Sequence, residues 1–369
     1  MGNKLRIVHT ADIHFDAPFS SLDASLARQR KNELKQSFET IIETVKTKNA
    51  DLLVIAGDLF DSENTNHLTV EFINSMFSRI PDTYIFISAG NHDPKTQTSY
   101  YNMLDLRENV HIFSGEFEKI SIDALDLDVY GISFTSAFAH GLGLPKVQNA
   151  QKTNLLVMHA DTQTDSGYNS VSAADIENSG FDYVALGHIH QPVISQKIGL
   201  TPWAYCGTPE PKGFDETGDK GVLYVEIEKP RVSIEFVKTC KRNYYTEQVD
   251  VSGAENHREI AEMASSRITD GHGLYKIVLT GETALSVSTQ YISDALTGKC
   301  FFAKVYDKTL PLTDYKKYAN TNTLKGLFVK LMLEKIEKCT DDAERQICTD
   351  ALKTGFDVLD GKEVSVIED

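Results

Sequence analysis

The sequence predicts an α/β fold in which helices cover a mostly parallel sheet, followed by a smaller α+β part. Two observations lead to this prediction. Short apolar runs, typical of buried strands, alternate with stretches in which apolar residues recur every three or four positions, the spacing of a helix. Asp, Asn and His side chains then follow these runs directly. Because the carboxyl ends of parallel strands meet at one edge of an open α/β sheet, these polar side chains should gather there.

The first part of the chain carries five runs that predict strands. They cover residues 5–9, 51–55, 84–87, 155–158 and 183–186. Apolar residues between 34 and 45, and again between 72 and 80, lie on one face of a helix. Residues 222–225 and 232–236 are expected to pair as antiparallel strands, with Pro230 in the turn between them.

The pattern changes after residue 240. It predicts, in order, a strand, a helix, a strand, a helix and a strand over residues 245–251, 255–267, 274–280, 287–296 and 300–306. An amphipathic helix should cover residues 324–336, and Thr340-Asp341-Asp342 should begin another. We therefore expect a large domain over residues 1–239, a small α+β domain over 240–312 and a helical segment over 313–369.

Composition excludes several classes of protein. The 369 residues are 41% hydrophobic and 24% charged, which argues against a disordered, collagen-like or purely coiled-coil chain. No apolar run approaches the roughly 20 residues of a membrane span, and no secretory signal is recognised, so we expect a cytoplasmic protein. The five cysteines are scattered and never spaced as C-x-x-C, which argues against a disulfide framework and a zinc knuckle.

The net charge of −16 is unfavourable for gripping nucleic acid by bulk electrostatics. Only −4 of it falls within residues 240–369. The acidic excess therefore lies in the first part, where some carboxylates could hold cations.

Five motifs stand directly after the predicted strands. They are Asp12-Ile13-His14, Gly57-Asp58-Leu59-Phe60-Asp61, Gly90-Asn91-His92-Asp93, His159-Ala160-Asp161 and Gly187-His188-Ile189-His190. In extended backbone, side chains two positions apart point the same way and can reach one ion. Oxygen and imidazole ligands without thiolate favour Mn²⁺, Fe or Mg²⁺ over a structural zinc site. Seven such ligands are too many for one ion but suit two ions sharing a carboxylate, and the glycines permit close backbone approach.

With this pattern the chain resembles the calcineurin-like metallophosphoesterase superfamily over about residues 4–228. The finer resemblance is to the SbcD-type DNA repair exonucleases and their bacterial YhaO-like relatives. It rests on Asp12-Ile13-His14 near the N-terminus, on Gly187-His188-Ile189-His190-Gln191-Pro192, and on Tyr205-Cys206-Gly207-Thr208-Pro209-Glu210 leading to Gly213-Phe214-Asp215-Glu216. The resemblance implies an αββα sandwich with a small α+β capping domain and C-terminal helices.

The resemblance also implies roles for individual residues. Asp12, His14, Asp58 and His190 would surround one metal, and Asp58, Asn91, His159 and His188 the other, with Asp58 bridging. His92 would stabilise the transition state or donate a proton to the leaving oxygen. Asp61 and Asp93 are candidates to orient His92, since carboxylates commonly orient imidazoles. Archaeal and eukaryotic repair nucleases of the superfamily tend to have His where this chain has Asp61, which matches the bacterial branch.

The first function hypothesis is a DNA exonuclease or endonuclease of the SbcD type that uses two divalent ions, with Mn²⁺ preferred over Mg²⁺ or Fe. Its expected partners are DNA, an SbcC-like coiled-coil ATPase docking on residues 324–336, and a second copy of the chain. Residues 241–245 and 315–318 mix cations with aromatics, a pattern that is more typical of a solvated face but could also contact DNA. The alternatives are a hydrolase of small phosphoesters, such as cyclic nucleotides or phosphomonoesters, and a catalytically silent scaffold.

Overall fold

The computed structural model of the chain describes residues 4–62, 65–139, 143–163 and 167–361. The chain divides into two compact units. Unit 1 consists of Met1–Glu247, Ile268–Ile277 and Leu296–Lys304. Unit 2 consists of Gln248–Arg267, Val278–Ala295 and Val305–Asp369.

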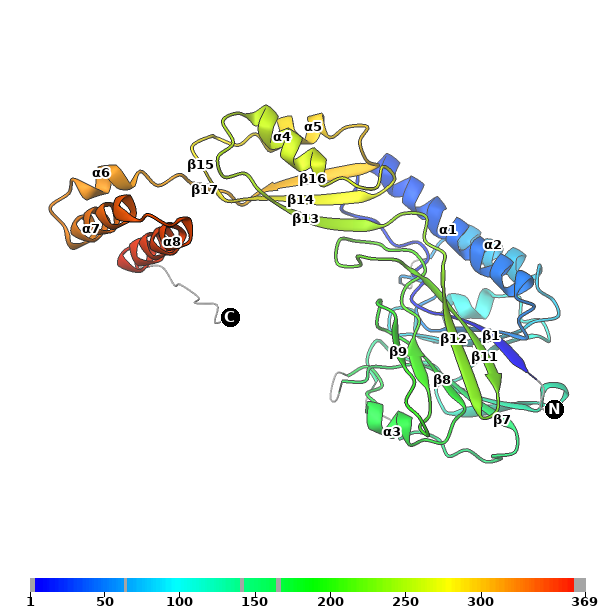
Figure 1. The fold of residues 1–369 in the computed structure, drawn as a ribbon. Coiled ribbons are helices and arrows are strands. Elements are labelled where there is room, and N and C mark those ends of the chain that lie inside the picture. The colour runs from blue at the N-terminus through cyan, green and yellow to red at the C-terminus, as the bar shows by residue number, and fades with distance from the viewer. Residues whose placement is uncertain (1–3, 63–64, 140–142, 164–166, 362–369) are drawn as a thin grey trace. The chain divides into compact units, whose positions relative to one another are not determined.

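Two six-stranded sheets make up most of unit 1 (Figure 1). The first has the order β12-β11-β1-β2-β3-β4, in which β1 to β4 are parallel and β11 and β12 form an antiparallel hairpin. Its strands are β1 (Leu5–Thr10), β2 (Leu52–Ala56), β3 (Tyr84–Ser88), β4 (Val110–Ile112), β11 (Gly221–Glu228) and β12 (Arg231–Lys238). The predicted strands of this sheet are confirmed, and Pro230 lies in the hairpin turn.

The second sheet has the order β5-β6-β7-β8-β10-β9. Strands β6, β7, β8 and β10 are parallel, and β5 and β9 pair antiparallel at the two edges. Its strands are β5 (Glu118–Ile122), β6 (Leu127–Ile132), β7 (Thr153–His159), β8 (Tyr183–Gly187), β9 (Val193–Ser195) and β10 (Trp203–Tyr205). The sequence predicted only β7 and β8 of this sheet.

Alternate residues of each strand face different layers. Leu52 and Val54 belong to a core cluster that also holds Val157 of β7 and Ala185 of β8, so this cluster lies between the sheets. The intervening residue Leu53 belongs to a second cluster, which includes residues of α1 (Ala24–Thr47) and α2 (His67–Phe77). A third cluster packs α3 (Ala173–Glu177) on the outer face of the second sheet. These layers form the expected αββα sandwich.

Helix α1 illustrates why the sequence folds in this way. Asp23 caps its N-terminus, where the carboxylate accepts hydrogen bonds from the Ser25 and Leu26 amides. The predicted apolar stripe from Leu34 to Val45 is buried against the first sheet. In the described part of the sandwich there are also two short 3₁₀ helices, η1 (Tyr100–Met103) and η2 (Asp123–Leu125).

The elements predicted after residue 240 are all present. A three-stranded sheet has the order β13-β14-β16 and is formed by β13 (Tyr244–Asp250), β14 (Leu274–Thr280) and β16 (Phe302–Asp307). The other elements are α4 (His257–Ser266), β15 (Glu282–Thr283), α5 (Thr289–Ala295), β17 (Leu310–Pro311), α6 (Tyr315–Ala319), α7 (Leu324–Lys338) and α8 (Asp342–Leu359). Asp341 caps α8, as its sequence position predicted. Across the described residues, every helix is too short or too polar to cross a membrane.

Much of the segment 241–245 packs inside unit 1 and forms neither a solvated face nor a surface open to DNA. The Arg242 guanidinium pairs with Glu33 at 2.8 Å and lies 3.6 Å from the centroid of the Phe301 ring. Tyr244 is fully buried, and Tyr245 stacks on Tyr275 with ring centroids 4.7 Å apart. These side chains are engaged in packing and are therefore not free to stack on bases.

We predict that Gly187→Ala destabilises the sandwich. A Cβ at position 187 would lie 1.9 Å from the Ala56 carbonyl oxygen, so the ends of β8 and β2 would have to move apart. Overpacking of this kind costs about 1–3 kcal/mol. Thermal unfolding of Gly187→Ala should therefore begin at a clearly lower temperature than that of Gly271→Ala, because the nearest atom to a Cβ at 271 is 3.7 Å away. Equal midpoints for the two variants would contradict this account.

Candidate metal centre

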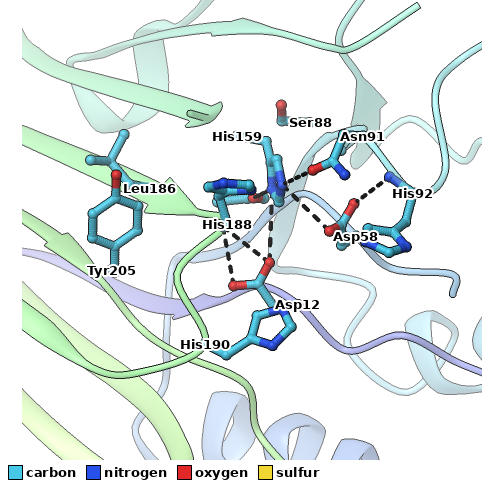
Figure 2. Close-up of polar contacts among 12 residues, drawn as sticks. Asp12, Asp58, Ser88, Asn91, His92, His159, Leu186, His188, His190 and Tyr205 are labelled. Carbon is cyan, nitrogen blue, oxygen red and sulfur yellow. Dashed lines mark hydrogen bonds and ion pairs between the residues drawn. The ribbon is translucent and has the colours of Figure 1, made fainter. Parts of the chain in front are cut away.

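The seven predicted ligands all lie at the carboxyl edge of the two sheets. Figure 2 labels these ligands except His14. Asp12 and His14 follow β1, Asp58 follows β2, Asn91 follows β3, His159 ends β7, and His188 and His190 follow β8. The backbone at Asp12, His14 and Asp58 is left-handed, with φ values of 52°, 51° and 49°. Such conformations cost free energy and persist only where the surroundings enforce them, as they often do at functional sites.

Asp58 lies at the middle of the cluster. Its Oδ2 atom is 3.6 Å from Nε2 of His14 and 3.4 Å from Nε2 of His159. Its Oδ1 atom accepts the backbone N–H of His92 at 3.0 Å. One carboxylate oxygen therefore faces a histidine from each sheet.

Asp12 is fixed from the second sheet. Its two carboxylate oxygens accept the His188 backbone N–H at 3.0 and 3.2 Å. Among the described residues, possible metal-ligand atoms of His and Asp lie within 4.8 Å of one another in three sets, which we call donor groups. These groups are Asp12, His14 and His190; Asp12, Asp58 and His159; and His14, Asp58 and His92.

His159 shows that a cation suits this arrangement. Its Nδ1 atom is 2.9 Å from the Ala56 carbonyl oxygen, which can only accept, so Nδ1 carries a proton. Burial lowers the pKa of His159 and keeps the ring neutral. The Nε2 lone pair then faces Oδ1 of Asn91 at 3.0 Å and Oδ2 of Asp58 at 3.4 Å. The nitrogen lone pair and the two oxygens are all hydrogen-bond acceptors, and no proton lies between them. A bound cation stabilises such an arrangement.

His190 is held in a similar way. Its Nδ1 atom is 2.7 Å from Oε1 of Glu216, and its Nε2 atom is 3.2 Å from Nε2 of His14. Burial alone would raise the pKa of Glu216, but the His190 hydrogen bond and the Lys212 charge lower it to about 2. Glu216 is therefore a carboxylate that accepts from Nδ1. Metal-bound histidines commonly donate their second N–H to a carboxylate in this way.

The glycines allow this close packing, as predicted. A Cβ at Gly57 would lie 2.2 Å from Nδ1 of His159, and one at Gly90 would lie 2.0 Å from Oδ1 of Asp58. Any larger residue at either position would displace a predicted ligand.

The positions of His188 and His92 agree less well with their predicted roles. The His188 ring packs on Tyr168 with centroids 4.8 Å apart, and its Nε2 atom is 3.9 Å from Oδ2 of Asp161. Among the described residues, the His188 side chain belongs to none of the three donor groups. His92 was not expected to bind a metal, yet it belongs to one of these donor groups. Its Nδ1 atom lies 3.2 Å from the Asp61 carbonyl oxygen.

The carboxylates of Asp61 and Asp93 have other partners than those expected. Asp93 is buried and accepts from the Gly90 and Phe60 amides and, at 2.6 Å, from the Tyr101 hydroxyl. The Asp61 carboxylate lies 3.3 Å from Nδ1 of His14. Among the described residues, the His92 ring makes no hydrogen bond to either carboxylate. Asp93 therefore braces the turn that carries Asn91, and Asp61 reaches His14.

Sequence reasoning missed the roles of Glu216, Lys212 and Asp161. Glu216 stood in a recognised stretch, Gly213-Phe214-Asp215-Glu216, but received no role. Lys212 lies 3.3 Å from Glu216, and its Nζ atom is 3.4 Å from the Asp12 carbonyl oxygen. The loop from Gly207 to Gly221 thus contacts the site.

Residues 5–192, just over half of the chain, match the calcineurin-like phosphoesterase family. The chain belongs to this family. Its members are metal-dependent hydrolases with a dinuclear metal site, and the donor groups of this phosphoesterase suit such a site.

Individual relatives are more distant. The chain is 27% identical over 274 residues to the uncharacterised metallophosphoesterase YhaO of Bacillus subtilis, covering 70% of this chain and 66% of that protein. It is 25% identical over 266 residues to the DNA double-strand break repair protein Mre11 of Aeropyrum pernix, covering 67% and 64%. The match thus spans slightly under two thirds of these relatives. A solved dimetal phosphatase from Danio rerio is 10% identical with a TM-score of 0.40, covering 64% of this chain and 96% of that one.

We predict that Glu216 controls metal affinity through His190. Glu216→Ala removes the acceptor that fixes the His190 ring, and losing such a contact usually weakens metal binding about 10- to 100-fold. Glu216→Gln keeps an acceptor oxygen without the charge and should fall between Glu216→Ala and the wild type. Titration calorimetry with Mn²⁺ measures this, with the exposed Glu228→Gln as control. Unchanged affinity in Glu216→Ala would show that the contact is merely structural.

A second prediction concerns pH. Burial raises the pKa of Asp12 and Asp58. Burial alone would lower the pKa of His190, but the Glu216 hydrogen bond and the Asp12 charge together raise it. Groups with raised pKa values hold protons in acidic solution that a metal must displace. Metal affinity should therefore rise with pH and level off once these groups are deprotonated. Calorimetry in buffers of different ionisation enthalpy should show proton release at pH 5.5 that declines by pH 8. Proton uptake would contradict the ligand assignment.

Proposed function

We propose that this phosphoesterase is a dinuclear-metal-dependent phosphodiesterase that cleaves DNA, as an exonuclease or endonuclease of the SbcD type. The observation that carries the proposal is the position of Asp58. Its Oδ2 atom lies between Nε2 of His14 and Nε2 of His159, one from each proposed ligand set. A carboxylate in that position suits a bridge between two cations.

In the proposal, one ion is held by Asp12, His14, Asp58 and His190, and the other by Asp58, Asn91, His159 and His188. Two such ions, Mn²⁺ in preference to Mg²⁺ or Fe, would supply Lewis-acid chemistry to a bound phosphodiester and to the attacking water. The chain's own residues position these ligands. Asp93 braces the Gly90 turn, and Glu216 fixes the ring of His190. The Asp61 carboxylate lies 3.3 Å from Nδ1 of His14.

His92 is the proposed proton donor to the leaving oxygen. Its backbone N–H is tied to Asp58, and its Nδ1 atom faces the Asp61 carbonyl oxygen, so the ring orientation is fixed. When the ring is protonated, Nδ1 donates to that carbonyl oxygen and Nε2 retains a proton to give. The ring is also partly exposed, as a group that meets a substrate must be.

DNA is the proposed substrate because two relatives, from Aeropyrum pernix and Methanopyrus kandleri, are named DNA double-strand break repair proteins. The match to the first extends over 67% of the chain, beyond the family segment. Lys316 and Lys317, both exposed on α6, remain candidates to contact phosphates. On this proposal, residues 1–239 are catalytic, 240–312 cap the site and the location is cytoplasmic.

Exposed apolar side chains support the two proposed protein partners. Leu324, Leu327 and Leu331 of α7 share one helix face and are 73%, 54% and 56% exposed. This face suits docking to the coiled coil of an SbcC-like ATPase. In unit 1, Leu68 of α2 and Met103 of η1 are 62% and 45% exposed, a candidate contact for a second copy of the chain.

The alternative substrate is a small phosphoester, which the net charge of −16 favours. A substrate panel separates the two functions: end-labelled single- and double-stranded DNA, a bis-aryl phosphodiester, an aryl monoester and cyclic nucleotides, each with Mn²⁺, Mg²⁺ or chelator. Metal-dependent cleavage of DNA and of the diester is expected. Activity on the monoester alone would exclude the nuclease.

Asp58→Asn should lose tightly bound metal and turnover while remaining folded. Removing the charge leaves two cations that repel each other in one buried pocket. Elemental analysis of the purified variant measures the loss, and circular dichroism checks the fold. A wild type that is active with at most one metal per chain would contradict the bridging role.

His92→Ala should keep both ions and lose activity by about 10²- to 10⁴-fold, the usual range for general acid catalysis. Metal content and the rate on a bis-aryl phosphodiester are measured on the same preparation. His111→Ala is the control, because this half-buried histidine pairs with Glu118 at the edge of the first sheet. Loss of metal from His92→Ala would make His92 a ligand.

A further inference from the structure

The C-terminal helices bring two of the five cysteines together. Cys339 follows the last residue of α7, and Cys348 lies in the second turn of α8. Their Sγ atoms are 3.9 Å apart although the residues are nine positions apart in the chain. Both are buried, with 6% and 4% exposure. Among the described residues, Cys206 and Cys240 have their Sγ atoms against oxygen atoms of Gly207 and Asn243, away from any such sulfur neighbour. The Cys339 Sγ atom also lies 3.3 Å from the Lys335 carbonyl oxygen.

The hairpin formed by α7 and α8 has a small core. Its buried apolar side chains are Val329, Leu352 and Phe356, to which partly buried neighbours add contacts. Leu324, Leu327 and Ile347 are more than half exposed. A unit with so few buried side chains gains unusually from a covalent link.

The geometry favours such a link at the turn of the hairpin. Cys339 has left the helix, with φ −66° and ψ 128°, and Asp341 caps α8 only two residues later. A disulfide needs the sulfur atoms about 2.05 Å apart. The sulfur atoms must therefore approach by about 2 Å. Side-chain rotation next to a turn can supply this movement more easily than it could between two rigid helix interiors.

We propose that Cys339 and Cys348 are a redox modification site, at which exchange with glutathione disulfide forms a reversible intramolecular disulfide between α7 and α8. One cysteine thiolate attacks glutathione disulfide and expels one glutathione thiolate. The second cysteine thiolate attacks the mixed disulfide and expels another. The two cysteines lose two electrons and two protons, and glutathione disulfide becomes two molecules of glutathione.

The surroundings set the rate of this exchange. Burial raises the pKa of the Cys339 thiol, and the neighbouring Cys348 raises it further. Only a small fraction is thiolate at neutral pH, so oxidation is slow there and accelerates as the pH rises. The closed loop is short, and the link restricts opening of the hairpin.

The test uses the full-length chain in glutathione buffers of increasing oxidation at pH 7 and pH 8.5. Samples are quenched with acid, unfolded, alkylated with N-ethylmaleimide and digested with trypsin. Cleavage after Arg345 places the two cysteines on separate peptides, so only a disulfide keeps these joined. We expect this joined pair, two fewer alkylated thiols per monomer, and reversal by dithiothreitol. The Cys348→Ser variant should not form the joined peptide pair, whereas the control variant Cys240→Ser should still form it.

Hydrogen exchange then tests the effect on the hairpin. Oxidation should slow exchange of α7 and α8 amides by about tenfold or more, with no change in β2. Alkylation of both cysteines at every buffer ratio would overturn the proposal, as would links through Cys206, Cys240 or Cys300, or links between chains. A disulfide that leaves exchange in both helices unchanged would overturn its stabilising role. Because mapping is done on the wild-type chain, misfolding of a variant does not affect the result.

Discussion

The site is built around three hydrogen-bond acceptors that face one another with no proton between them. The Ala56 carbonyl oxygen fixes the tautomer of His159, which leaves its Nε2 lone pair facing the oxygens of Asn91 and Asp58. In a buried pocket this arrangement is costly unless a cation occupies it. The free energy of folding the sandwich must therefore hold the ligands together before any metal binds. Left-handed backbone at Asp58 and at both ligands after β1 shows the same constraint in the main chain.

The loop after β10 connects this site to the buried side of α1. Thr208 donates its hydroxyl to the Asp12 carbonyl oxygen, and Glu216 holds His190. Between them, the fully buried Glu210 pairs with Arg30 and accepts the Ser37 hydroxyl at 2.6 Å. A buried ion pair is weak evidence for stability but strongly fixes geometry, since losing either partner leaves an unpaired charge. The ligand positions thus depend on residues of α1 that lie outside the family's motifs.

Much of this could be predicted because the relevant signals are local. Apolar runs such as Leu52–Ala56 predicted the central strands, and the residues directly after them predicted the ligands. Strands such as Val110–Ile112 and Trp203–Tyr205 were missed because they have three residues each and depend on neighbouring strands for their hydrogen bonds. β6 was missed because Asp128 and Gly131 interrupt its apolar pattern. Asp128 is buried in this strand, where its carboxylate accepts a hydrogen bond from the Ser121 hydroxyl.

Residue roles that depend on tertiary contacts were harder to predict from the sequence. Asp93 follows His92 in sequence, yet its carboxylate turns away to Gly90, Phe60 and Tyr101. Arg242 sits in a cation-rich stretch but pairs with Glu33, 209 positions away. On the proposed function, this pairing has a consequence for the substrate. With Arg242 used internally and a net charge of −16, attraction for DNA phosphates must come largely from the bound metal ions, exposed lysines and a partner protein. Metal would then govern DNA binding as well as cleavage.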